Sequence, residues 1–346
     1  ATRSISVARM WNDIDFSYVW DNQININKQF GDHDISYDFI QSAQMNRYET
    51  AFAYGRDVPF NSLWYNVQSA PQRDASSGFE KSTLLSFTNR FNYSYLDRYL
   101  LTATMRWDGS SKLSEGNKWA SFPSAAIAWR MSDEAFMQNL ETVNNLKLRL
   151  SYGYTGNNNI PAYSTQSALD RQAYYDWDGS TADGFIPSRL ANSELTWERT
   201  REWNLGADFG LFNNRISGSF DYFIKKTDDL LYNVPTLATS GFTHRTTNIG
   251  SMENKGHEFT LTSVNIEKDR FRWSTSLNMA SIRNKVTSLI GDEPIQVGGW
   301  NAIIPGQPLG VFYGYKQQGL YQTLEEIPEA LQRQGVRPGD MIFEDL

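Results

Sequence analysis

The sequence predicts an all-β protein: an antiparallel transmembrane β-barrel, of which this chain holds a part of about 11 or 12 strands. Three observations predict it. Apolar and polar residues alternate along many segments, the connections between these segments are alternately short and long, and aromatic residues are frequent while mean hydropathy is low. Of the 346 residues 14% are aromatic, yet mean hydropathy is -0.54. A barrel fits both values because half of every strand faces a polar lumen.

The clearest hairpin shows the alternation in both arms. Apolar side chains occupy every second position from Leu85 to Tyr95, with one exception, and again from Tyr99 to Trp107. Such spacing gives each strand one apolar and one polar face. The turn between the arms is short, as in an antiparallel hairpin.

The same pattern continues along the chain. It predicts strands near residues 4–10, 16–30, 34–54, 81–95, 99–108, 122–131, 146–154, 196–210, 215–225, 254–266, 270–284 and 308–316. The links expected to be short are residues 31–33, 96–98, 211–214 and 267–269, and those expected to be long are residues 55–80, 109–121, 155–195, 226–253 and 285–307. An outer-membrane barrel keeps short turns on the periplasmic side and long loops on the extracellular side, which favours it over a soluble sandwich.

One periplasmic link differs from the others because it is expected to contain a helix, at residues 135–140. Ser132 supplies an N-cap, and Asp133 and Glu134 place acidic groups in the first turn. We expect this helix to lie against the barrel rim.

The strand ends predict how the barrel sits in a membrane. Several predicted strands exceed the roughly 9 to 11 residues that cross a bilayer, so they should project on the loop side. Tryptophans near the strand ends predict interfacial aromatic girdles. They are Trp107, Trp119, Trp129, Trp197, Trp203 and Trp273.

Composition excludes several classes of protein. No run approaches the roughly 20 apolar residues of a membrane helix. The net charge of -7 and the lack of a Lys/Arg block make nucleic acid an improbable partner. Cysteine is absent, which removes disulfides and thiolate chemistry. The chain starts without an export signal, so we interpret it as a processed or interior piece.

Short motifs resemble the SusC/RagA family of TonB-dependent outer-membrane transporters. They occur in family order along nearly the whole chain. The motifs are residues 99–111, 119–124, 128–130, 133–136, 146–153, 155–157, 197–198, 204–206, 214–216, 221–223, 248–250, 254–258 and 310–315.

The resemblance implies the rest of the architecture and the partners. Residues 1–346 would be part of the barrel domain, with the N-terminal plug domain, the TonB-box segment and the C-terminal strands absent. A SusD-like surface lipoprotein would act as a lid, and the TonB complex would act through the missing plug region. The implied location is the outer membrane of a Gram-negative bacterium, with Bacteroidota as the implied group, and the implied cargo is an oligosaccharide or a peptide.

The sequence carries no enzyme constellation, and we expect no cofactor and no metal site. The histidines His33, His244 and His257 have no ligand spacing. The candidate ligand-binding residues lie in two predicted loops and combine aromatic rings with carboxylate or amide groups, as sugar recognition requires. They are Tyr174, Tyr175, Asp176, Trp177, Asp178, Trp300 and Asn301. An equally good explanation is that these aromatic loops pack on the barrel or on a partner lid.

Two other functions fit the same sequence. A passive porin would need neither TonB nor a lid, and a plug domain upstream would argue against it. A soluble glycan-binding β-sandwich would use the same loop aromatics but would need no membrane.

Overall fold

The computed structural model describes residues 6–344, apart from the side chains of residues 61, 171–175, 181, 183 and 238. It comprises two compact units, Ala1–Arg283 and Asn284–Leu346. Among the described residues, no helix is long and apolar enough to cross a membrane.

The strands are β1 (Val7–Phe30), β2 (His33–Arg56), β3 (Gln72–Tyr95), β4 (Tyr99–Ser110), β5 (Trp119–Arg130), β6 (Val143–Asn157), β7 (Ala168–Trp177), β8 (Ser180–Arg189), β9 (Glu198–Leu211), β10 (Ile216–Asp228), β11 (Leu231–Pro235), β12 (His244–Asn248), β13 (Gly250–Lys268), β14 (Phe271–Leu289), β15 (Ile295–Val297), β16 (Asn301–Ile303), β17 (Val311–Phe312), β18 (Gln317–Leu320) and β19 (Met341–Phe343). The helices are the short 3-10 turns η1 (Asn61–Leu63), η2 (Val67–Ser69), η3 (Met131–Asp133), η4 (Ala238–Ser240) and η5 (Ile290–Asp292), and α1 (Glu329–Arg333).

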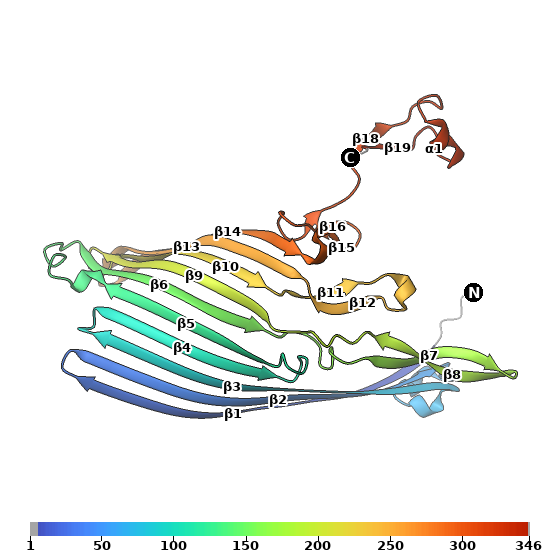
Figure 1. Cartoon of the computed structure of the whole chain (residues 1–346), viewed down its shortest axis with the longest axis horizontal. Helices are drawn as coiled ribbons and strands as arrows, with labels where there is room; N and C mark the ends of the chain where they lie inside the picture. Colours follow the sequence, from blue (N-terminus) through green and yellow to red (C-terminus); the bar gives the residue numbers. More distant parts are fainter. Residues whose placement is uncertain (1–5, 345–346) are drawn as a thin grey trace. The chain divides into compact units, whose positions relative to one another are not determined.

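Ten strands form one sheet, in the order β1-β2-β3-β4-β5-β6-β9-β10-β13-β14. Each strand lies beside its predecessor, apart from two small inserted hairpins, β7–β8 and β11–β12 (Figure 1). Pairing is antiparallel along the sheet. A sandwich would place its strands in two layers face to face. The single continuous sheet confirms the predicted barrel wall and contradicts the sandwich.

Apart from one link, short and long links lie at opposite ends of this sheet, as the sequence predicts. The exception is residues 131–142, which join β5 to β6 at the end of the tight turns and are longer than residues 111–118, which join β4 to β5 at the other end. Tight turns join β1 to β2, β3 to β4, β9 to β10 and β13 to β14 at one end (Figure 1). The links that carry η1 and η2, β7–β8 and β11–β12 lie at the other end. We refer to these as the short-link end and the long-link end.

The two faces of the sheet differ in chemistry, because the strand register aligns the alternating residues. One row across six neighbouring strands is wholly apolar. It consists of Tyr93, Leu101, Ile127, Leu150, Leu205 and Tyr222, each opposite the next. The adjacent row on the other face is mostly polar or small and consists of Asn92, Thr102, Ala126, Ser151, Asn204 and Phe223.

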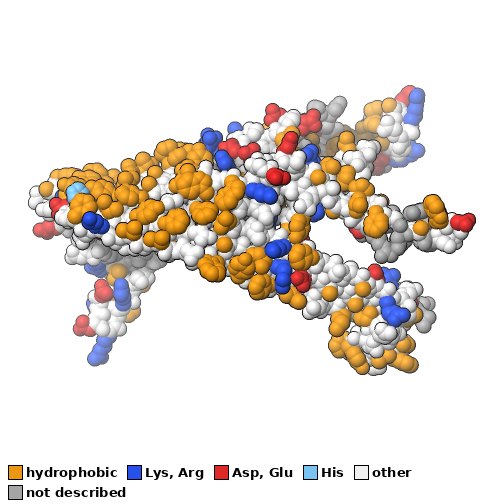
Figure 2. Space-filling view, turned by 60° about the horizontal axis from the view of Figure 1, so that its bottom comes forward, with side chains coloured by type: hydrophobic (Ala, Val, Ile, Leu, Met, Phe, Trp, Pro, Cys, Tyr) orange, Lys and Arg blue, Asp and Glu red, His pale blue; other side chains and the backbone are white. Residues whose placement is uncertain are grey.

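We call these the apolar face and the polar face. Hydrophobic side chains gather over the short-link half of the sheet in Figure 2, and charged side chains become frequent beyond it. On β4 the apolar alternation lasts from Tyr99 to Trp107, which matches the roughly 9 to 11 residues of a membrane-crossing strand.

Five of the six predicted girdle tryptophans are exposed: Trp107, Trp119, Trp129, Trp203 and Trp273. Trp197 is the exception, with 3% exposure. Its ring packs against Phe122 in a cluster below the long links, and its indole Nε1 donates a hydrogen bond to the carbonyl of Lys118 at 2.9 Å. The prediction that Trp197 belongs to a girdle was therefore wrong.

The prediction of a helix at residues 135–140 was also wrong, because the backbone at its expected start is extended. Glu134 has an extended backbone (φ -79°, ψ 148°) after the short turn η3. Its carboxylate accepts hydrogen bonds from the Tyr99 hydroxyl at 2.6 Å and from the Trp129 indole at 3.0 Å. Phe136 contacts the Trp129 ring, so the segment lies against the short-link rim, as expected.

Several strand boundaries differ from expectation. β3 begins at Gln72 and not near residue 81, so it takes up part of the link expected at 55–80. The strands expected at 4–10 and 16–30 form one strand, β1, because every one of its residues pairs with β2. The long links at 155–195 and 226–253 contain the hairpins β7–β8 and β11–β12. The strand expected at 308–316 is reduced to Val311–Phe312, because Gly310 has a left-handed backbone (φ 76°).

Strands β1, β2 and β3 are much longer than a membrane requires. Each has 24 residues. At about 3.3 Å per residue such a strand measures about 80 Å, against a hydrocarbon core of about 30 Å. These strands are therefore longer than a hydrocarbon core requires, in agreement with the expected overhang.

Candidate functional site

The polar face carries ordered ion pairs. Arg149 of β6 reaches across two strands and binds Asp208 of β9 through two hydrogen bonds, at 2.9 and 3.0 Å, and Asp221 of β10 at 3.1 Å. A bidentate guanidinium–carboxylate pair fixes the orientation of both groups. Because these side chains are only partly buried, the pairs contribute little to folding stability and mainly shape the wall.

A second charged group on the same face lies nearer the long links. The guanidinium of Arg106 donates two hydrogen bonds to Asp108, both at 2.8 Å, and a third to the hydroxyl of Ser86. Since these polar side chains face one side of a sheet whose other side is apolar, the polar face suits a water-filled passage.

Two hollows lie along this wall. One has a volume of about 450 Å³ and is lined by Thr102, Ser124, Ser151, Glu202 and Asn204, among others. The second has a volume of about 300 Å³ and lies on the long projecting strands. Asp15, Tyr48 and Glu80 line it from the sheet, and Lys112 and Pro161 line it from the links. Hydroxyl, amide and carboxylate groups on both hollows fit a polar ligand better than an apolar one.

At the long-link end, three links fold into one rigid layer that we call the loop platform. It consists of residues 110–118, 158–164, 190–197 and 229–249. Leu113, Ile160 and Leu195 form its buried centre. Asn248 joins two of the links, because its side chain donates to the carbonyls of Thr196 and Asp229.

Further hydrogen bonds tie the loop platform together. The Ser114 hydroxyl donates to the carbonyl of Leu195 at 2.7 Å, and Asn158 donates to the Ser110 hydroxyl at 2.7 Å. Links with a buried centre and paired polar groups resist local opening. The platform is therefore a preformed surface.

The predicted ligand-binding residues fall into two groups, one in each compact unit. Asp176, Trp177 and Asp178 lie at the tip of the β7–β8 hairpin, where Asp178 has a left-handed backbone (φ 52°). Trp177 is 69% exposed. The backbones of Tyr174 and Tyr175 belong to β7, but their side chains lie outside the described residues.

The other two predicted residues belong to the second compact unit. Trp300 is 76% exposed, and its carbonyl accepts a hydrogen bond from the backbone of Tyr313. Asn301 uses its amide to bind the carbonyl of Gly310 at 3.0 Å. Its amide thus has a structural partner within the same unit, and the ligand-binding role of all seven residues stays a prediction.

Two histidines act as aromatic partners on the apolar face. His33 lies at the short-link end between the rings of Phe30 and Tyr95, at centroid distances of 5.1 and 4.9 Å. His257 stacks against Tyr222 at 5.2 Å. In the part of the chain that the structure describes, no three His, Cys, Asp or Glu side chains lie close enough together to hold a metal ion.

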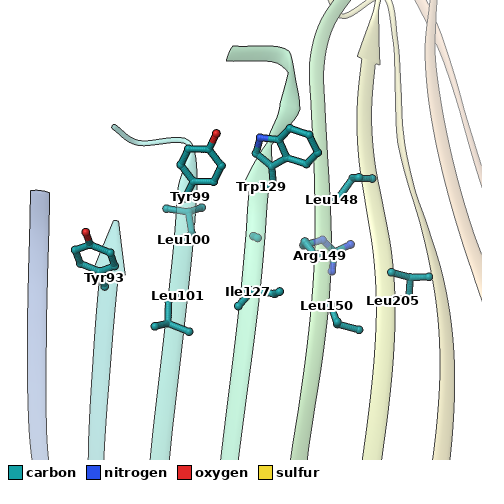
Figure 3. Close-up of a pocket in the computed structure, with 11 residues that line it drawn as sticks. Tyr93, Tyr99, Leu100, Leu101, Ile127, Trp129, Leu148, Arg149, Leu150 and Leu205 are labelled. Atoms are coloured by element: carbon teal, nitrogen blue, oxygen red, sulfur yellow. The ribbon is translucent and has the colours of Figure 1, made fainter. Parts of the chain in front are cut away.

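An apolar hollow lies on the opposite face. Its volume is about 510 Å³, and leucine, isoleucine and aromatic side chains from five strands surround it (Figure 3). Leu101, Ile127, Leu150 and Leu205 are part of the apolar row described above. On a surface that faces hydrocarbon, such a groove fits a lipid acyl chain rather than a polar cargo.

Comparison with known proteins agrees with this geometry. The family model "TonB dependent receptor-like, beta-barrel" matches residues 2–337. TonB-dependent receptor P3 of Formosa agariphila is 36% identical over 339 residues, which are 94% of this chain and 34% of that protein. TonB-dependent receptor SusC of Bacteroides thetaiotaomicron is 34% identical over 297 residues, 82% of this chain and 29% of that protein.

A solved structure shows the same fold. The RagAB peptide transporter superimposes with a TM-score of 0.80 at 25% identity, over 91% of this chain and 35% of that chain. The chain thus spans about a third of the length of the relatives it matches.

Proposed function

Because this chain belongs to the TonB-dependent receptor β-barrel family, we propose that it forms a third of an active outer-membrane importer and supplies part of its barrel wall. The observation that carries the proposal is the ten-stranded sheet, with its apolar face, its polar face and its links sorted by length. In this assignment the short-link end faces the periplasm, and the long-link end faces the cell exterior.

The polar face would line the path of the cargo. Fixed ion pairs such as Arg149 with Asp208 keep the wall polar without leaving isolated charges, so a hydrated ligand can move along it. Energy would come from the TonB complex, acting on a plug domain in the rest of the protein. We propose no catalytic role for the side chains of this wall.

We propose an oligosaccharide as cargo, with a peptide as the other option. The exposed Trp177 beside Asp178, and the exposed Trp300, support a sugar ligand, because flat rings stack on pyranose faces while polar groups bind hydroxyls. The peptide option rests on RagAB, a peptide transporter with the same fold.

A SusD-like surface lipoprotein would close the exterior side, and we propose the loop platform as its seat. A partner needs a surface that keeps its shape, and the buried centre around Leu195 with its hydrogen bonds supplies one. The test is co-purification of the full-length protein with the lipoprotein. We expect substitutions that reverse the charge of two exposed platform residues to lower the yield of the complex. Unchanged co-purification would remove the platform from the interface.

Transport is tested in cells that contain the full-length protein as their only importer of this type. One labelled mixture of oligosaccharides and one labelled mixture of peptides are supplied, with TonB present or deleted and with or without a protonophore. We expect uptake from one mixture to fall to background when TonB or the proton gradient is lost. Uptake that persists without both would identify a passive porin, and a lack of uptake from both mixtures would contradict the proposed cargo classes.

A further inference from the structure

An aromatic strip lies on the long-link halves of β1 and β2, outside the two loops predicted to bind ligand. Trp11 contacts Phe52 with ring centroids 5.3 Å apart, and Phe52 stacks on Tyr54 at 6.2 Å. The pairing of β1 with β2 is uninterrupted, so these residues share the polar face with the lumen wall. Trp11 is 59% exposed.

The opposite face at this height is already covered by the chain itself. Ala8 is fully buried beneath the link between β2 and β3, together with Val58 and Ala70. A side chain at Gly55 would collide with Ala70 at 2.5 Å. The strip is therefore the free face of this extension, and it lies on the side along which cargo would enter.

Two guanidinium groups accompany the strip. The Cζ atoms of Arg9 and Arg56 lie 5.4 and 5.2 Å from the centroid of the Tyr54 ring. Arg56 also donates a hydrogen bond from Nε to the Tyr54 hydroxyl at 2.6 Å. Tyr54 is thus a positioning residue that holds both cations, while Trp11 and Phe52 supply the stacking surface.

These two cations differ from the arginines of the lumen wall. Arg106 and Arg149 are bound by carboxylates, whereas among the described residues neither Arg9 nor Arg56 forms an ion pair. This chain has a net charge of -7, so two guanidiniums on one ring are a local departure from an acidic average. Asp74 lies opposite Tyr54 in the register and shares its face, but it accepts a hydrogen bond from the backbone of Ala75 and, within the described part of the chain, forms no ion pair with Arg9 or Arg56. Two like charges held together attract an anion.

The backbone around the strip is not free to bind a ligand. Phe52 and Tyr54 pair with β1 on one side and with β3 on the other. A peptide that added as a strand would need unpaired N–H and C=O groups. Recognition here must use ring faces and cations, which suits a sugar with apolar faces and anionic substituents.

We propose that Arg9, Trp11, Phe52, Tyr54 and Arg56 form an outer subsite for an acidic oligosaccharide, one that carries carboxylate or sulfate groups. The sugar ring stacks on Trp11 and Phe52, and the anionic group binds the guanidiniums of Arg9 and Arg56. This assignment rests on the proposed function, because it names the class of cargo that the importer would first contact.

The subsite is tested by titration calorimetry on the full-length protein in detergent. The probes are tetragalacturonate, a sulfated carrageenan tetrasaccharide, maltotetraose as a neutral sugar and tetraglutamate as an acidic peptide. The first two distinguish carboxylate from sulfate. The variants are the double substitution Arg9→Gln/Arg56→Gln and the single substitution Trp11→Ala. The matched control is Arg73→Gln, because Arg73 lies opposite Gly55 in the register and therefore on the other face of the sheet beside the strip.

We expect at least one acidic tetrasaccharide to bind about tenfold more tightly than maltotetraose at low salt, since charge-assisted hydrogen bonds exceed neutral ones. The double variant should abolish this preference, and Trp11→Ala should weaken all sugar binding about fivefold, because it removes a stacking surface. Arg73→Gln should bind as the unaltered protein does.

Each other outcome overturns the assignment. Equal affinity for maltotetraose, a preference that survives the double variant, no binding of either acidic sugar, or tighter binding of tetraglutamate would each contradict it. Such a failure is separate from that of the transport proposal. TonB-dependent uptake with no acidic sugar bound removes the subsite alone, whereas TonB-independent uptake removes the importer and leaves the calorimetric result standing.

Discussion

The assignment of the two faces makes a sharp prediction for neighbouring residues of β6. Leu150 lies in the middle of the apolar row, between Ile127 and Leu205, while Ser151 points to the polar face between Ala126 and Asn204. If the apolar face contacts hydrocarbon, Leu150→Arg places a charge near the middle of the bilayer. The same substitution one residue later, Ser151→Arg, places it in water.

The expected magnitudes are far apart. Arginine on the lipid face near the bilayer midplane lowers the free energy of unfolding by about 2–4 kcal/mol, a factor of about 30 to 1,000 in the folding equilibrium. At an exposed position of a water-soluble protein the same change usually stays within about 0.5 kcal/mol. Leu150 is 38% exposed in the chain, so packing within the protein cannot account for the larger value. We expect about 2–4 kcal/mol for Leu150→Arg and less than about 1 kcal/mol for Ser151→Arg.

The assay is reversible urea unfolding of the full-length protein in lipid vesicles, followed by protease protection and by heat-dependent migration on gels. Leu150→Ala serves as the control for loss of side-chain contacts alone. Equal effects of Leu150→Arg and Ser151→Arg, or a larger effect of Ser151→Arg, would refute the assignment of the faces and with it the membrane orientation.

Three further predictions concern the links and the rim. Leu195→Ala, which empties a position with 0% exposure, should lower local stability of the loop platform by about 2–5 kcal/mol in hydrogen exchange, whereas Leu237→Ala, at 80% exposure, should not. Gly156→Ala should destabilise the protein by about 1–3 kcal/mol, because the added Cβ would lie 2.1 Å from a buried aromatic ring, whereas Gly299→Ala should be neutral in the same unfolding assay. The main cause that holds the pKa of Glu134 below its ordinary value of 4.5 is the hydrogen bond from the Tyr99 hydroxyl. The hydrogen bonds that hold Glu134 against the short-link rim are therefore complete above pH 4.5 and are lost as the pH falls through the lowered pKa. The protection factor of the following segment, which is its exchange rate corrected for the intrinsic pH dependence of amide exchange, should therefore fall in acid. Glu134→Gln should show the lower protection factor already at neutral pH, and a pH-independent protection factor in the unaltered protein would contradict this.

Much of the barrel wall was predictable because its signal is local. Alternation from Tyr99 to Trp107 needs only the period of an extended chain, and a short turn between two such segments needs only adjacent strands. For the same reason the long links were predictable in place but not in content. The β7–β8 hairpin pairs with itself and has no membrane to impose a regular pattern on it.

Two of the errors, those at Trp197 and at residues 135–140, share one cause, which is that contacts from other elements changed the role of a local motif. Trp197 has the sequence context of a girdle residue, but the folding of its link over Leu113 and Ile160 buries it. Glu134 fits a helix start, yet hydrogen bonds from Tyr99 and Trp129 hold it extended. The hydrogen bond from Tyr99 to Glu134 and the packing of Trp197 join residues far apart in the sequence, so a short window of sequence does not display them.

The candidate ligand-binding residues also divide into those that the sequence could indicate and those that only the strand register brings together. The sequence offered Trp177 and Trp300 because each adjoins polar residues along the chain. The strip of Trp11, Phe52 and Tyr54 is distributed over two strands, and its only early signal was the frequency of aromatic residues. The register between β1 and β2 places the three rings together.

The sequence by itself determined the period of the strands, the chemistry of their two faces and the order of short and long links, because these depend on neighbours within a few residues. Only the tertiary structure decided which rows align, which links lock into the loop platform and which cations remain without a carboxylate. Those outcomes depend on strand register and on chain segments that meet across dozens of residues, where the free energy of packing overrides local preference.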